Sequence, residues 1–149
     1  MKLFVKMTAT CLGLGFFPLA PGTLTSAVVV LLYKLFLFKL SWPFYLLTFV
    51  FLFLLGIYAS HIYSKSQKKE DPRSAVIDEA AGQLLALFLI NPTWILCASS
   101  FVLFRFFDII KPFPIKQVED FPKGFGIMLD DVVAALFAGI LLNLYLLLK

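Results

Sequence analysis

The chain has 149 residues, of which 61% are hydrophobic and only 15% are charged, and its formal net charge is +4 at pH 7. A soluble domain has about 45–50% apolar and about 25% charged residues. A chain of this length has room for one core only. The composition therefore excludes a soluble domain, a disordered chain and a disulfide scaffold, and it favours a polytopic membrane protein.

Five segments approach the roughly 20 apolar residues that a helix needs to cross a bilayer. In chain order they are Thr23–Leu40, Trp42–Tyr63, Asp78–Ile90, Thr93–Ile110 and Val132–Leu148. Asn91-Pro92 separates the third from the fourth because asparagine–proline favours a turn. The third is therefore short, and we expect it to be tilted or re-entrant. The sequence predicts an all-α, polytopic integral membrane helical bundle of about five helices, forming one membrane-embedded domain over residues 1–149.

Three segments between these helices are polar or rich in proline and glycine: residues 1–22, 64–77 and 111–131, the last of which we expect to be a structured loop. With the N-terminus inside, all three lie on the cytoplasmic side, where basic residues concentrate in membrane proteins. Together with Arg105 at their edge they hold 10 of the 13 basic residues, namely Lys2, Lys6, Lys65, Lys68, Lys69, Arg73, Arg105, Lys111, Lys116 and Lys123. This bias predicts the orientation. A nucleic-acid partner is not expected, since the basic residues form no stripe on a soluble module.

The two cysteines and the single histidine give no support to a metal site or a nucleophile. Cys11 and Cys97 lie in apolar sequence without CxxC spacing, which is typical of buried thiols and gives no support to a zinc site. His61 is the only histidine, and we expect it to lie at the inner membrane interface. A lipid phosphatase with a histidine nucleophile is therefore disfavoured.

Carboxylates form two adjacent pairs where helices are predicted to begin, Asp78-Glu79 and Asp130-Asp131. Helix capping would explain one acid at each helix start but not two pairs beside hydrocarbon. Two charges about 4 Å apart repel by about 4 kcal/mol at an effective dielectric near 20, so a cation must separate the pairs if they meet. Oxygen ligands without a cysteine or histidine cluster favour Mg²⁺ or Mn²⁺. The sequence predicts a metal site formed by Asp78, Glu79, Asp130 and Asp131, with capping as the alternative.

Helical spacing supports a meeting of the two pairs. Asp131, Ala135 and Gly139 lie four residues apart and so share one helix face, as do Asp78 and Gly82. Small residues allow membrane helices to approach closely. We therefore expect these two helices to pack against each other.

Arg105, Asp108 and Lys111 follow one another at three-residue spacing near a predicted helix end. Ionisable residues at membrane depth indicate function, and an arginine fork suits a phosphate. An internal Arg–Asp ion pair is the alternative. Lys123 lies in a glycine-containing segment and Thr23 at a helix start, which attracts anions. We expect Thr23, Arg105, Lys111 and Lys123 to bind a phosphate.

Four motifs resemble those of the phosphatidylglycerophosphatase A family of bacterial membrane phosphatases, over a region from Gly13 to Gly139. The family usually has glycine where this chain has Thr25, and often a glycine where it has Lys123. The motifs are Gly13-x-Gly15-x-x-Pro18-x-x-Pro21-Gly22-Thr23, Val76-Ile77-Asp78-Glu79, Phe104-Arg105-x-x-Asp108-x-x-Lys111-Pro112-x-Pro114-Ile115 and Gly124-x-Gly126-Ile127-Met128-x-Asp130-Asp131.

The resemblance implies a phosphoric monoester hydrolase: Mg²⁺-dependent removal of the terminal phosphate of phosphatidylglycerophosphate, giving phosphatidylglycerol for bacterial phospholipid synthesis. It places the chain in the bacterial inner (cytoplasmic) membrane, with the site facing the cytoplasm. Asp78, Arg105, Asp108 and Asp131 are the expected catalytic residues, and either a water or an aspartate can be the nucleophile. A small ion transporter or channel with an acidic cation site is the alternative, although transporter sites usually lie nearer the membrane midplane.

Overall fold

The computed structural model describes residues 3–69, 71–118, 121 and 124–148. These residues form seven α-helices, two short 3₁₀ helices and no strand, which confirms the all-α class. In chain order the helices are α1 (Leu3–Ala9), η1 (Leu14–Phe16), α2 (Pro21–Leu35), η2 (Leu37–Lys39), α3 (Trp42–Gln67), α4 (Ile77–Ala86), α5 (Trp94–Ile110), α6 (Ile115–Val118) and α7 (Gly124–Leu147).

Among the described residues, two helices are long and apolar enough to cross a membrane, α3 with 26 residues and α7 with 24. The helix α2 is apolar but has 15 residues, and α5 has 17. At 1.5 Å per residue, the ten residues of α4 extend over about 15 Å, half the thickness of a bilayer's hydrocarbon core. The expected shortness of this helix is confirmed.

The outer faces of the long helices are apolar. On α3, Leu47, Phe51, Leu54 and Tyr58 are each more than half exposed and follow a helical spacing along one side. On α7, Ile140, Leu141, Leu144, Tyr145 and Leu147 are also more than half exposed. An apolar surface of this extent is typical of a protein face that contacts lipid.

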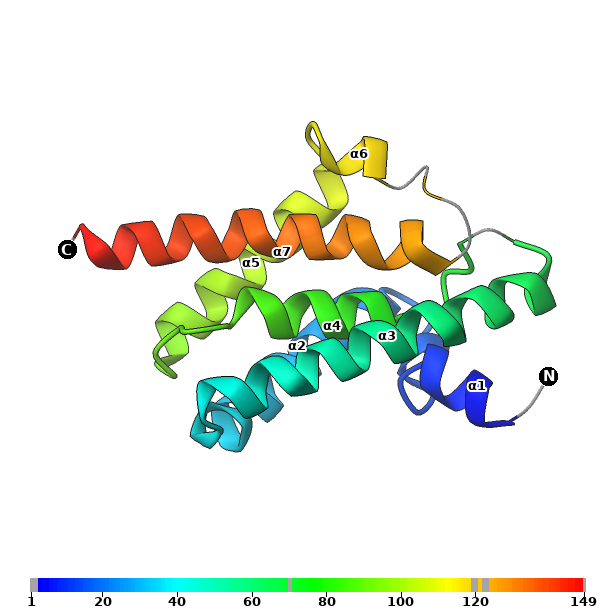
Figure 1. Cartoon of the computed structure of the whole chain (residues 1–149), viewed down its shortest axis with the longest axis horizontal. Helices are drawn as coiled ribbons and strands as arrows, with labels where there is room; N and C mark the ends of the chain where they lie inside the picture. Colours follow the sequence, from blue (N-terminus) through cyan, green and yellow to red (C-terminus); the bar gives the residue numbers. More distant parts are fainter. Residues whose placement is uncertain (1–2, 70, 119–120, 122–123, 149) are drawn as a thin grey trace.

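The short helix α4 lies inside the bundle, where it contacts α2, α3, α5 and α7 (Figure 1). Eight of its ten residues are buried. Its start is fixed by a hydrogen bond from the backbone N–H of Val76 to the carbonyl of Ala9 at the end of α1, with an N···O distance of 2.8 Å. The acids of its first turn are therefore carried into the protein interior.

Several of the connections lie toward the two ends of the long axis. Figure 1 shows α1, the end of α3 and the start of α7 toward one end, and the C-terminus, the α2–α3 connection and the α4–α5 turn toward the other. The described parts of residues 1–22 and 64–77 thus lie toward the end where α7 begins, whereas α6 lies nearer the middle of the long axis.

One predicted boundary is wrong. Residues 111–131 do not form a single loop, because α6 lies within them and α7 begins at Gly124 rather than at Val132. A Cβ atom at Gly124 would lie 2.2 Å from the carbonyl oxygen of Ile57 on α3. This glycine permits close packing of two helix backbones, whereas the sequence predicted a structured loop at this position.

The other boundaries differ less. The helix α2 begins at Pro21, where proline suits the first helical turn, and α3 continues to Gln67, four residues beyond the predicted Tyr63. The helices α1 and η1 were not predicted within residues 1–22. Val5 and Ala9 of α1 pack on Ala59 and Tyr63 of α3, so this segment joins the bundle through tertiary contacts.

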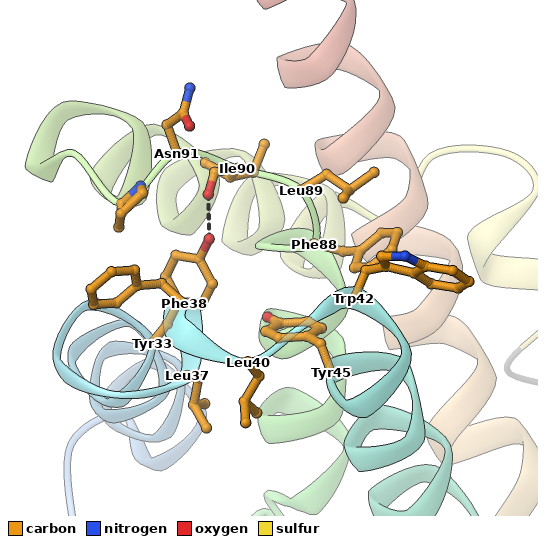
Figure 2. A pocket seen from close by; sticks show the side chains of 11 residues that line it. Tyr33, Leu37, Phe38, Leu40, Trp42, Tyr45, Phe88, Leu89, Ile90 and Asn91 are labelled. Carbon is orange, nitrogen blue, oxygen red and sulfur yellow. Dashed lines mark hydrogen bonds between the residues drawn. The ribbon is translucent and has the colours of Figure 1, made fainter.

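A cavity of about 240 Å³ lies between the C-terminal part of α2, the start of α3 and the residues after α4. Figure 2 shows Tyr33, Trp42, Tyr45 and Phe88 around it, with the Tyr33 hydroxyl donating a hydrogen bond to the carbonyl of Ile90. None of its lining residues carries an acidic or basic side chain. The acids and cations singled out from the sequence belong to a different part of the fold.

Candidate active site

The first acidic pair opens α4, as predicted. Asp78 and Glu79 lie in its first turn, where the positive end of the helix dipole favours negative charge. Asp78 is 8% exposed, and the Glu79 side chain is 17% exposed. Both carboxylates therefore lie largely out of contact with water.

The second acidic pair does not open a helix. Because α7 begins at Gly124, Asp130 and Asp131 lie about two turns inside it, and the described first turn of α7 has no acid. The two side chains are 6% and 2% exposed. Helix capping therefore cannot account for Asp130 and Asp131. It remains an alternative to metal binding only for Asp78 and Glu79 on α4.

Small residues bring the two helices together, as their spacing predicts. A Cβ atom at Gly82 on α4 would lie 3.1 Å from the Cβ of Asp131 and 2.7 Å from the ring of Phe104. Farther along, Gly139 lies close to the backbone of Ala86. The close approach of α4 and α7 aligns Asp131 with the acids of the α4 first turn.

Three carboxylates meet at this contact. Asp78, Glu79 and Asp131 each offer one oxygen, and the three oxygens lie within 4.8 Å of one another. One oxygen of each residue is buried without a hydrogen-bond partner among the described residues: Asp78 Oδ1, Glu79 Oε2 and Asp131 Oδ2. Burying a charge without a partner is very costly, and carboxylate oxygens are the ligands that Mg²⁺ prefers. The three residues thus fit a divalent cation.

The fourth predicted ligand lies beside a lysine. Asp130 Oδ2 accepts a hydrogen bond from Lys111 Nζ at 2.7 Å. Lys111 ends α5 in a left-handed conformation with φ 47°, and its backbone N–H donates to the carbonyl of Phe107. The structure therefore groups Asp78, Glu79 and Asp131, and it places Asp130 in a separate pair. We call the first three residues the carboxylate cluster.

Arg105 joins α5 to the cluster. Its Nη1 lies 2.6 Å from Asp108 Oδ2, in the i,i+3 pair that the sequence predicts, and 3.9 Å from Glu79 Oε1. Its Nε is buried without a hydrogen-bond partner among the described residues. The internal Arg–Asp ion pair that was the alternative to phosphate binding exists, and the same guanidinium also reaches the acid of another helix.

The N-terminus of α2 contacts the cluster through Gly22, a role that sequence analysis missed. A Cβ atom at Gly22 would lie 1.9 Å from Glu79 Oε1. The signal was present as Pro21-Gly22 at a helix start, but its partner lies 57 residues later in the chain. The predicted phosphate ligand Thr23 follows Gly22 and is half-buried, and its role stays a prediction. Lys123, predicted for the same role, lies outside the described residues.

Cys11 lies near the cluster but is poorly suited to act as a nucleophile. Its thiol donates to the carbonyl of Val76 at 3.5 Å. Burial, followed by the negative charges of Asp78 and Glu79, raises the pKa of the Cys11 thiol to about 12. The thiol is therefore protonated at neutral pH, and thiolate is the reactive form.

A family model described as phosphatidylglycerophosphatase A matches residues 7–146 of the chain. The chain belongs to the phosphatidylglycerophosphatase A family. This confirms the resemblance drawn from the four motifs, all of which lie within the matched residues. No solved structure matches the chain.

Three relatives cover most of the chain. A phosphatidylglycerophosphatase A of Haemophilus influenzae is 37% identical over 136 residues, which is 90% of this chain and 83% of the relative. A phosphatidylglycerophosphatase A of Escherichia coli is 36% identical over 139 residues, covering 91% and 80%. A Bacteroides thetaiotaomicron protein, provisionally named phosphatidylinositol-3-phosphatase, is 38% identical over 144 residues, covering 91% and 89%.

The contact between Gly22 and Glu79 gives a prediction for this member of the phosphatidylglycerophosphatase A family. In Gly22→Ala the new methyl group must displace the Glu79 carboxylate, so we expect divalent-cation affinity to fall about 10- to 100-fold, as when the support of a metal ligand is disturbed. Gly139→Ala is the matched control, because its nearest neighbour would lie at an ordinary 3.7 Å. Mn²⁺ titration of both variants measures the effect, and equal affinities would show that Gly22 does not position Glu79.

Proposed function

We propose that the chain removes the terminal phosphate of phosphatidylglycerophosphate, with a divalent cation, Mg²⁺ or Mn²⁺, held by Asp78, Glu79 and Asp131. Membership of the phosphatidylglycerophosphatase A family supports the reaction class, hydrolysis of a phosphoric monoester, and the substrate. The observation that carries the metal assignment is the set of three buried carboxylate oxygens, beside the Arg105 guanidinium, that have no hydrogen-bond partner in the described part of the chain.

A divalent cation bound by the cluster would supply Lewis-acid polarisation of the phosphoryl group and would lower the pKa of a bound water. Arg105 offers guanidinium N–H groups to the phosphoryl oxygens, where negative charge develops. Asp108 holds that guanidinium in place through the 2.6 Å ion pair. The guanidinium of Arg105 also forms a second, longer ion pair with Glu79. The phosphate-binding arginine and the carboxylate cluster are therefore fixed relative to each other.

The reaction breaks the bond between phosphorus and the oxygen of the terminal glycerol. Water supplies the new oxygen of the released phosphate, and a proton ends on the alcohol of phosphatidylglycerol. Direct attack by water and attack by an aspartate carboxylate followed by hydrolysis are both chemically competent. In either route Arg105 acts on the same phosphoryl oxygens.

We further propose that residues 1–149 form one domain in the bacterial inner membrane with the N-terminus in the cytoplasm. The helices α2, α3, α5 and α7 would cross, and the chain would make its remaining passage inside the bundle through α4 and residues 87–93. The exposed apolar faces of α3 and α7 support this placement. The concentration of basic residues in residues 1–22, 64–77 and 111–131 supports the orientation. The site would then lie where the substrate phosphate meets the cytoplasmic surface.

The substrate assignment is tested by phosphate release from purified protein in detergent. Phosphatidylglycerophosphate, phosphatidylinositol-3-phosphate and phosphatidic acid are compared at equal concentrations, the second because of the name of the Bacteroides relative. We expect the highest kcat/KM with phosphatidylglycerophosphate. Release from phosphatidylinositol-3-phosphate alone would reject the proposed substrate while leaving a lipid phosphatase.

The orientation predicts which positions a membrane-impermeant maleimide can reach in intact cells. In a cysteine-free background, Gln67→Cys lies at the exposed cytoplasmic end of α3, and Ser41→Cys lies at its exposed opposite end. We expect Ser41→Cys to be labelled in intact cells and Gln67→Cys only after permeabilisation. The reverse pattern would invert the topology.

A further inference from the structure

The two adjacent aspartates of α7 differ in their surroundings. Both oxygens of Asp130 have partners: Oδ2 accepts from Lys111 Nζ at 2.7 Å, and Oδ1 accepts from the backbone N–H of Asp131 at 3.0 Å. Asp131 Oδ2 is instead buried without a hydrogen-bond partner among the described residues. A metal ligand must have a free oxygen to offer, so the second aspartate fits that role better than the first.

Helix geometry explains the difference. Successive residues of an α-helix point about 100° apart, so two adjacent side chains in the middle of a helix can contact two different neighbouring helices. Asp131 packs against α4 beside Gly82, where Asp78 and Glu79 lie. Asp130 meets the residue that ends α5. The adjacent pair in the sequence thus becomes two contacts with two different helices.

The charges near the end of α5 follow a pattern. Arg105 is paired with Asp108 and Lys111 with Asp130, so each of these two cations has a carboxylate within 2.7 Å. Among the described residues, the ion pair that reaches the carboxylate cluster is the longer contact of 3.9 Å between Arg105 Nη1 and Glu79 Oε1. A divalent cation placed against Asp130 would compete with the Lys111 ammonium, which is 2.7 Å from Asp130 Oδ2. In the cluster the cation that the described residues provide, Arg105, is more distant.

We propose that Asp130 is a positioning residue that holds Lys111 for the substrate phosphate, while Asp131 belongs to the metal site. This inference rests on the proposed function. The Lys111 side chain is 25% exposed and its partner 8% exposed, so a buried carboxylate holds an ammonium that an anion can reach. Arg105 and Lys111 then form two phosphate contacts near the cation, each fixed by its own aspartate.

Removing either member of the Lys111–Asp130 pair should therefore weaken substrate binding rather than metal binding. A hydrogen bond to a charged group contributes enough binding free energy that its loss should raise KM about 10- to 100-fold. We expect this rise in both Asp130→Asn and Lys111→Gln. kcat should fall by a smaller factor. The double variant should be little worse than either single one, because residues of one pair are not additive. Lys111→Arg should recover part of the lost affinity.

The experiment measures Mn²⁺ binding by electron paramagnetic resonance on purified protein without substrate, together with kcat and KM for phosphatidylglycerophosphate. Asp130→Asn should bind Mn²⁺ within about threefold of the unchanged protein, whereas Asp131→Asn should lose about 10- to 100-fold or more. Equal losses of Mn²⁺ affinity in the two aspartate variants would overturn the proposal, as would an unchanged KM in Lys111→Gln.

The outcomes separate this inference from the proposed function. If the unchanged protein releases no phosphate from phosphatidylglycerophosphate, the proposed function fails, yet Mn²⁺ binding still decides between the two aspartates. If Asp130→Asn does not fold, Lys111→Gln and Lys111→Arg test the same pair from the α5 side. A rise in KM with Mn²⁺ affinity preserved would support the inference in either variant.

Discussion

Replacing Asp131 by asparagine is expected to reduce phosphate release by about 10³-fold, because a metal ion contributes several kcal/mol of charge stabilisation and each 1.36 kcal/mol is tenfold in rate. The amide has nearly the same shape, and Asp131 is buried with one oxygen that has no hydrogen-bond partner among the described residues. The substitution therefore removes a negative charge without opening a cavity. Turnover and divalent-cation binding are measured together with the thermal unfolding midpoint.

Asp71→Asn is the matched control, since it makes the same chemical change at an exposed residue outside the carboxylate cluster. We expect it to retain most of the activity. An Asp131→Asn protein with normal turnover would remove this residue from the metal site. A protein that is inactive because it is unfolded would be recognised by its lost thermal transition.

Replacing Arg105 is expected to cost nearly as much. Loss of one charge-stabilising donor typically reduces the rate about 10²–10³-fold, and we expect this from Arg105→Ala, with divalent-cation binding retained. Arg105→Lys should also lose much of the activity, since an ammonium is a point charge whereas a guanidinium presents a planar fork to two phosphate oxygens. The lysine variant preserves the positive charge beside Asp108 and Glu79, so it separates geometry from charge.

The competing explanation makes Arg105 a structural anchor for the end of α5. Its 2.6 Å contact with Asp108 and 3.9 Å contact with Glu79 would then serve packing alone. In that case Arg105→Lys should be nearly silent, and Arg105→Ala should lower yield and thermal stability. An Arg105→Ala protein that is destabilised but turns over normally would contradict the phosphate-binding role.

The sequence predicts helices well where composition alone decides them. Trp42–Tyr63 is an uninterrupted apolar stretch, and α3 begins at the predicted residue. The start of α7 was missed because glycine is ambiguous: it permits a turn, and it also permits two backbones to touch. At Gly124 the second role applies, because the backbone of Ile57 on α3 lies against it. The sequence around Gly124 does not show that Ile57 is its neighbour. The helix α1 depends in the same way on its contacts with α3.

The sequence predicts which residues belong to the candidate site better than it predicts which of them contact each other. Adjacent acids beside hydrocarbon indicate a cation, and the spacing of Arg105 and Asp108 predicts their ion pair. Asp130 and Asp131 are separated because they lie inside α7, where one side chain meets the end of α5 and the other meets α4. The partner of Asp130 is Lys111, 19 residues away on another element. No local pattern links those two residues, so only the packed bundle identifies the pair.

The most direct test is the dependence of phosphate release on a divalent cation. Purified protein is treated with excess chelator and assayed with phosphatidylglycerophosphate in detergent, and Mg²⁺ or Mn²⁺ is then added back beyond the chelator. Because Asp78, Glu79 and Asp131 bring three carboxylate oxygens within 4.8 Å, we expect turnover to be lost in chelator and restored by either cation. Full turnover in excess chelator would contradict a metal centre at these carboxylates.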